Sequence, residues 1–217
     1  MTERGPEESE RGRGFGPESA AESGPESGPT PLSASAHLAV IDMQRVFADS
    51  ESPWATPDFD RAAAGVRRLL PAFGDRVTFT RFLAPKEPAG AWRAYYDRWS
   101  FARRPPDAEL WSLHEEFAAT AHHVLDATTF GKWTPELAAR TGPVGRLVLA
   151  GVSTDCCVLF TALAAADAGI EVLVAADACA AGDDDAHARA LHLLDLHRPL
   201  IRVVTVDELL GADAIPV

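Results

Sequence analysis

Six short apolar runs separated by helical stretches constrain the fold of this 217-residue chain more than any other feature. The runs show no alternation of polar and apolar residues, which is typical of strands that are buried on both faces. The expected strands are His37–Asp42, Arg76–Thr80, His122–Ala127, Arg146–Ala150, Glu171–Ala176 and Leu200–Thr205. Helical patterns are expected at Asp60–Pro71, Asp107–Ala119, Thr154–Ala168 and Asp183–His197, with one further helix beginning at Thr134-Pro135. We therefore expect an α/β fold, a three-layer doubly wound six-stranded parallel sheet with helices on both faces.

Residues 1–36 differ in composition from the rest of the chain. They consist mainly of Gly, Pro, Glu, Ser and Ala and contain the near-repeat GPESAAESGPESGP. Such a segment cannot bury enough apolar surface to offset the entropy lost on ordering. We therefore predict a disordered tail at residues 1–36 and one globular domain at residues 37–217.

Composition excludes several classes of partner. The formal net charge of -12 argues against a nucleic-acid-binding surface, which needs a basic stripe. No apolar run is long enough to cross a membrane, so we expect no membrane partner. The three cysteines, two of them adjacent, form no disulfide framework and are typical of a reducing compartment. We therefore expect a cytoplasmic protein.

Four chemically capable residues follow the first four expected strands. Asp42 ends the first strand, Arg81 follows the second, Lys132 the third and Cys157 the fourth. Because ligands of open α/β sheets bind outside the carboxyl ends of the strands, these side chains are expected at one rim. The long irregular segment 82–106 leaves the same rim, and long loops at such positions commonly build a pocket.

The sequence GVSTDCCV at Gly151–Val158 lies between an apolar strand and an alanine-rich helix. This order places a cysteine in the first helical turn, where free N–H groups and the helix dipole favour a thiolate. A thiolate beside free amides suits nucleophilic catalysis, which indicates a hydrolase. Helix-start electrostatics alone does not distinguish Cys156 from Cys157.

Three motifs resemble those of one known family. They are IDMQ at Ile41–Gln44, FGKW at Phe130–Trp133, and GVSTDCCV followed by TALAAADAG at Thr161–Gly169. Together they resemble the isochorismatase-like cysteine hydrolase superfamily over about His37 to Leu210. That superfamily includes nicotinamidases, N-carbamoylsarcosine amidases and true isochorismatases.

The resemblance implies a catalytic triad of Asp42, Lys132 and Cys157, with Cys156 as a packing residue. It further implies an oxyanion hole formed by the backbone N–H groups of Ser153 and Cys157, with a cis peptide bond before Ser153. Such a site would cleave a linear C–N amide bond of a small molecule through a thioester. Two alternatives stay open: hydrolysis of a non-amide bond, as in isochorismatases, and a catalytically silent binding member of the family.

Comparison with the family also bears on cofactors and assembly. Nicotinamidases carry an Asp-x-His segment for a divalent metal after the second strand, whereas TRFLAPKEPAG at Thr80–Gly90 contains no histidine. We therefore expect no metal and no other cofactor. The family habit also predicts a homo-oligomer, either a dimer or a tetramer.

Seven residues are candidates for substrate binding: Gln44, Phe47, Arg81, Trp92, Tyr96, Phe130 and Trp133. Phe47, Phe130 and Trp133 lie within the motifs and are expected as pocket walls, whereas the helical spacing of Trp92 and Tyr96 also suits packing. Arg81 has two interpretations. It either pairs with Asp49 or Glu51, or it recognises a substrate carboxylate with its bidentate guanidinium.

Overall fold

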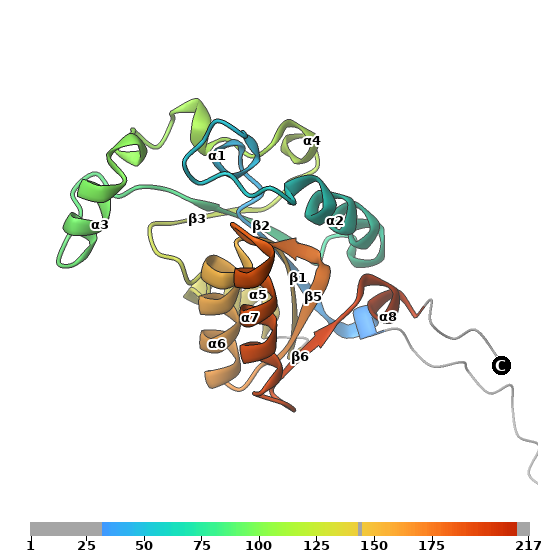
Figure 1. Cartoon of the computed structure of the whole chain (residues 1–217). Helices are drawn as coiled ribbons and strands as arrows, with labels where there is room; N and C mark the ends of the chain where they lie inside the picture. The colour runs from blue at the N-terminus through green and yellow to red at the C-terminus, as the bar shows by residue number, and fades with distance from the viewer. Residues whose placement is uncertain (1–31, 143–144, 212–217) are drawn as a thin grey trace, which may run out of the picture.

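The computed structural model describes residues 32–142 and 145–211, which form a six-stranded parallel sheet (Figure 1). The strand order is β3-β2-β1-β4-β5-β6, which is doubly wound from the central pair β1 and β4. The strands are β1 (His37–Ile41), β2 (Val77–Phe82), β3 (Val124–Ala127), β4 (Arg146–Val152), β5 (Glu171–Ala180) and β6 (Ile201–Val204). The α/β fold expected from the apolar runs is thus confirmed.

Helices cover both faces of the sheet. They are α1 (Arg45–Ala48), α2 (Phe59–Phe73), α3 (Trp92–Arg98), α4 (Glu115–Ala118), α5 (Pro135–Thr141), α6 (Leu159–Asp167), α7 (Asp184–Asp195) and α8 (Val206–Leu210). Helices α2 and α8 lie on one face, and α5, α6 and α7 lie on the other (Figure 1). Side chains of β1 alternate between the two layers, so that Val40 joins the core under α2 and Ile41 the core under α6.

The prediction of one continuous helix at Asp107–Ala119 is wrong. Only Glu109–Trp111 and α4 are helical, as a 3₁₀ turn and a single short helix. Between them the chain is extended, because Ser112 O accepts a hydrogen bond from Arg45 N at 3.0 Å and His114 N donates to Met43 O at 2.8 Å. This stretch therefore bonds to the segment after β1 instead of continuing a helix. Conversely, α3 forms within the segment that was expected to be irregular.

The chain is ordered earlier than the predicted tail boundary. Leu32–Ser35 forms a 3₁₀ turn, and Ser33 and Ala36 are buried. The Arg76 guanidinium donates hydrogen bonds to the carbonyl oxygens of both residues. Residues 32–36 thus belong to the domain, and the rest of the predicted tail lies outside the described residues.

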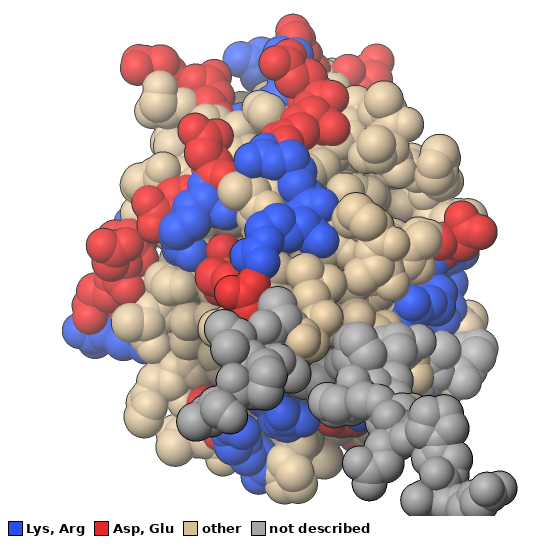
Figure 2. Space-filling model, turned by 90° about the vertical axis from the view of Figure 1, so that its right-hand side faces the viewer, with Lys and Arg blue, Asp and Glu red and all other residues tan. Residues whose placement is uncertain are grey.

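The surface on the side of α2 and α8 carries basic and acidic side chains next to one another (Figure 2). Arg67 and Arg68 on α2 pair with Glu116 and Asp207, so the positive charges there are locally neutralised. A search of the described residues for a helix long and apolar enough to cross a membrane finds none.

Candidate active site

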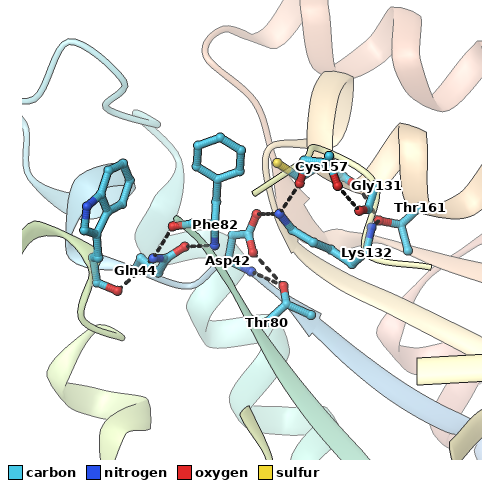
Figure 3. Close-up of polar contacts among 10 residues, drawn as sticks. Asp42, Gln44, Thr80, Phe82, Gly131, Lys132, Cys157 and Thr161 are labelled. Atoms are coloured by element: carbon cyan, nitrogen blue, oxygen red, sulfur yellow. Dashed lines mark hydrogen bonds and ion pairs between the residues drawn. The ribbon is translucent and has the colours of Figure 1, made fainter. Parts of the chain in front are cut away.

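A buried ion pair joins the ends of two segments that are distant in the sequence. Asp42 directly follows β1, adopts a φ of 48° and is completely buried, as is Lys132. Asp42 Oδ1 accepts a hydrogen bond from the Thr80 hydroxyl at 2.6 Å, and Asp42 Oδ2 lies 3.0 Å from Lys132 Nζ (Figure 3). Asp tolerates the left-handed conformation better than most residues, so this turn aims the carboxylate toward the neighbouring strands.

Lys132 is held by contacts along its whole length. Its backbone N–H donates to the Thr161 hydroxyl at 2.9 Å, and its Nζ donates to the carbonyl oxygen of Thr129 at 2.8 Å. The Nζ also lies 4.8 Å from the centroid of the Phe82 ring, within range of a cation–π interaction. These contacts fix the ammonium group in one position, as a group that stabilises charge must be.

Cys157 is positioned by the end of β4 and by the helix that follows. Gly151 has a φ of 114°, and a Cβ built on it would lie 2.1 Å from Ile41 O, so only glycine fits there. The Val152–Ser153 peptide bond is cis, as expected, and a π-helical turn at Thr154–Val158 leads into α6. The Thr161 hydroxyl that accepts from Lys132 also donates to Cys157 O at 2.6 Å (Figure 3). A single threonine therefore links the lysine segment to the cysteine helix.

Cys157 interacts electrostatically with both members of the ion pair, Asp42 and Lys132. A family model described as the isochorismatase domain matches residues 35–208. This chain belongs to the isochorismatase family.

Several solved structures share the fold of the chain. A cysteine hydrolase from Pseudomonas syringae pv. phaseolicola is 17% identical with a TM-score of 0.71, covering 88% of this chain and 97% of that chain. A nicotinamidase from Bacillus subtilis is 21% identical with a TM-score of 0.63, covering 77% and 98%. A putative hydrolase of the isochorismatase family from Chromobacterium violaceum is 25% identical with a TM-score of 0.62, covering 85% and 97%. The comparison with curated proteins gave no match.

The surroundings of the Cys157 thiol in this isochorismatase-family protein favour its protonated form. Contact with the Cys156 thiol, burial and the nearby Asp42 carboxylate all raise the pKa of Cys157, and Lys132 opposes them only in part. Burial and a neighbouring carboxylate thus act against the thiolate that the helix start was expected to favour. A base must take the thiol proton when the sulfur attacks. The Asp42 carboxylate, which interacts electrostatically with Cys157, is a candidate for this base.

A cavity of about 290 Å³ opens beside Cys157. Its lining comprises Phe47, Pro53, Trp54, Ala55, Thr56, Phe82, Tyr95, Trp99, Phe130, Ser153, Asp155, Cys156, Cys157 and Gly182. Phe47 and Phe130 line it as the motifs predicted. Cys156 also lines it, so its side chain is not a mere packing group.

Three aromatic walls were missed in the sequence. Trp54 is at the centre of the ring cluster, with its centroid 5.0 Å from that of Phe101 and 6.2 Å from that of Phe47. Tyr95 and Trp99 come from α3 and the residue after it. The aromatic residues of the segment 82–106 are visible in the sequence, but their spacing favoured Tyr96 over Tyr95 as a pocket residue.

Several predicted substrate-binding residues do not line this cavity. Tyr96 is completely buried, Trp92 packs against Phe130 with centroids 4.9 Å apart, and Trp133 packs on the opposite layer under α6. The Gln44 amide is fully engaged in backbone bonds: its Oε1 accepts from Phe82 N at 2.7 Å, and its Nε2 donates to two carbonyl oxygens (Figure 3). Gln44 therefore fastens the segment after β1 to the end of β2.

Arg81 pairs with neither of the carboxylates expected for it. Its guanidinium makes a bidentate contact with Asp126, with both N···O distances at 2.7 Å. The two residues are register partners on β2 and β3. Arg81 is thus committed to a cross-strand pair and is absent from the cavity lining.

Metal-ligating side chains do not gather anywhere in the described part of the chain. A search of residues 32–142 and 145–211 finds no group of three or more His, Cys, Asp or Glu side chains placed to hold an ion. Near the cysteine, one carboxylate and one ammonium face each other at 3.0 Å.

Proposed function

We propose that this protein hydrolyses a linear C–N amide bond of a small molecule through a thioester on Cys157. The observation that carries this proposal is a thiol that lines a cavity and interacts with a fully buried Asp42–Lys132 pair. Burying two charges costs several kcal/mol per ion unless they compensate each other, so such a pair beside a cleft is a functional candidate. Family membership and the nicotinamidase among the structural relatives support the choice of an amide.

Asp42 is the proton carrier in the proposed reaction. Its Oδ1 is occupied by Thr80, whereas its Oδ2 accepts no hydrogen bond from any described residue, although Lys132 Nζ lies 3.0 Å away. Oδ2 takes the thiol proton as the sulfur attacks the carbonyl carbon, and a C–S bond forms while the carbonyl electrons move onto oxygen. The same proton then passes to the amide nitrogen, the C–N bond breaks, and ammonia or an amine leaves.

A water molecule completes the cycle. Asp42 takes one proton from that water, whose oxygen attacks the thioester carbon. The C–S bond breaks, the carboxylic acid leaves, and the proton returns to the sulfur. Lys132 stays protonated throughout and stabilises the negative charge that moves between carboxylate and sulfur. The proposed steps use only groups of this chain and require no metal and no organic cofactor.

Backbone N–H groups hold the oxyanion in this scheme. Ser153 O accepts hydrogen bonds from Cys156 N and Val158 N, both at 3.1 Å, but none from Cys157 N between them. The Cys157 N–H, together with the Ser153 N–H after the cis bond, supplies the two donors. Loss of one such donor costs about 10²–10³ in kcat in other hydrolases.

The test is ammonia release from a panel of small carboxamides by the wild-type protein and by two cysteine variants. Cys157→Ala should lose activity by at least about 10⁴-fold, whereas Cys179→Ala should stay within a few-fold, because Cys179 is a buried core residue. Intact mass spectrometry should detect an acyl adduct that hydroxylamine removes. Ammonia release retained by Cys157→Ala would refute a thioester on Cys157. Absence of turnover on every carboxamide and of any adduct would favour a silent binding protein.

A further inference from the structure

The cavity beside Cys157 is lined by aromatic rings and a single charged side chain. The rings belong to Phe47, Trp54, Phe82, Tyr95, Trp99 and Phe130. Among the lining residues the only ionised side chain is Asp155, and no lysine, arginine or histidine is present. Aromatic faces attract cations through their quadrupole, and a carboxylate attracts them directly.

Two basic groups near the cavity are paired with carboxylates, and a third lies over one of its rings. Lys132 is paired with Asp42 and buried, and Arg81 is paired with Asp126 on the sheet. The guanidinium of the exposed Arg98 lies 5.2 Å from the centroid of the Trp99 ring. That contact shows that a ring of this cluster accepts a cation on its face.

The positive end of the cysteine helix has a defined role in the proposed reaction. Two of its first N–H groups, those of Cys156 and Val158, already donate to Ser153 O. The Cys157 N–H remains for the oxyanion that forms at the scissile carbonyl. A second anion on the substrate would therefore find these N–H groups in use and would meet the carboxylate of Asp155 in the lining.

Asp155 is the acidic residue of the cavity lining. Asp155 is exposed, and one of its oxygens, Oδ1, accepts a hydrogen bond from the Ser153 hydroxyl. The neighbouring His187, bonded to Thr154 at 2.9 Å, interacts electrostatically with Arg61 most strongly and then with Asp184, Asp58 and Asp155. The arginine in this group, Arg61, is 3.1 Å from the Asp58 carboxylate. Asp155 thus places a negative charge at this side of the cavity, which favours a positive ligand group there.

We infer that the substrate is a small amide with an apolar or aromatic body and a positively charged group that faces Asp155. A volume of about 290 Å³ is just below the range of about 300–1,000 Å³ typical of ligand pockets, which fits a body of about one ring. Amides that carry a carboxylate, which Arg81 would recognise if it faced the cavity, are disfavoured because the lining contains Asp155 and not Arg81. This inference rests on the proposed function, because it places the scissile amide at Cys157.

Binding is measured by calorimetry on the full chain carrying Cys157→Ala, so that no probe is turned over. The probes are 4-(aminomethyl)benzamide, 4-methylbenzamide and 4-carboxybenzamide, which differ in charge at one end of the same ring. The cationic probe should bind roughly 3- to 10-fold more tightly than the neutral one, and the anionic probe more weakly than both. Asp155→Asn should remove the advantage of the cation, and Asp155→Glu should keep it.

Asp184→Asn is the matched control. It removes the same charge from an exposed residue near His187 that does not line the cavity, so it should change the ratio of the affinities by less than about two-fold. Equal or tighter binding of the anionic probe, no detectable binding of the cationic probe, or an unchanged order in Asp155→Asn would overturn the inference. Failure of the proposed function is seen separately, as tight cation binding in Cys157→Ala without ammonia release by the wild-type protein.

Discussion

The buried Asp42–Lys132 pair makes the stability of this domain sensitive to the removal of either charge. Lys132→Met keeps most of the side-chain volume but leaves the Asp42 carboxylate in the interior with Thr80 as its remaining side-chain partner. Breaking a buried pair in this way costs about 3–5 kcal/mol of unfolding free energy. For a domain of this size that corresponds to a midpoint of thermal unfolding lower by about 6–20 °C.

A double-mutant cycle isolates the interaction itself. Urea unfolding is measured for the wild-type protein, Lys132→Met, Asp42→Asn and the double variant, each at the same neutral pH. Because the double variant leaves no unpaired buried charge, it should be more stable than the sum of the single effects predicts, by at least about 2 kcal/mol. Such a variant is inactive in the proposed reaction but remains folded.

The exposed pair of Arg81 and Asp126 serves as the control. Its side chains are 29% and 43% exposed, against 0% for Lys132 and Asp42, although its geometry is bidentate. Arg81→Met should therefore cost no more than about 1 kcal/mol. Additive effects of Lys132→Met and Asp42→Asn, or equal costs of Lys132→Met and Arg81→Met, would refute the assignment of a buried compensated pair.

Three further changes test single features of the structure. Gly151→Ala places a Cβ 2.1 Å from Ile41 O and should cost more than about 3 kcal/mol in urea unfolding, or prevent folding altogether. Cys156→Ala removes the largest influence that raises the pKa of Cys157, so the rate at which iodoacetamide alkylates Cys157 at neutral pH should increase; an unchanged rate would contradict the contact. Burial, assisted by nearby arginines, lowers the pKa of His37 from 6.5 to about 4, so the folded state binds fewer protons than the unfolded state between these values. Unfolding free energy should accordingly fall by up to about 3 kcal/mol as pH drops through that window, and His37→Gln should flatten the fall.

The sequence was sufficient to predict the sheet and the residues after its strands. Apolar runs without alternation locate strands reliably, and parallel strands bring their carboxyl ends to one edge. Asp42 and Lys132 could therefore be assigned to the same rim before their contact was known. Cys157 follows β4, and β4 lies beside β1, so its interaction with Asp42 and Lys132 follows from the order of the strands.

The pocket walls could not be predicted because they depend on tertiary packing. Tyr95 and Tyr96 are adjacent on α3, about 100° apart around the helix, and only the packing of α3 decides which one faces the cavity. The partner of Arg81 follows from the register of β2 with β3, which the sequence does not specify. The helix expected at Asp107–Ala119 is absent because its backbone bonds are made to residues near Gln44.

The Gln44 amide has a consequence for how substrate preference can change in this protein. Its Nε2 donates to the carbonyl oxygens of Phe82 and Trp111, which lie at the two ends of the excursion 82–111 that carries α3. Gln44 therefore anchors both ends of this excursion to the segment after β1. With both ends of that excursion fixed, the tip can exchange its aromatic residues while Asp42 and Lys132 stay where they are. Libraries confined to residues 92–99 should therefore alter which molecules are accepted without disturbing the machinery that breaks the bond.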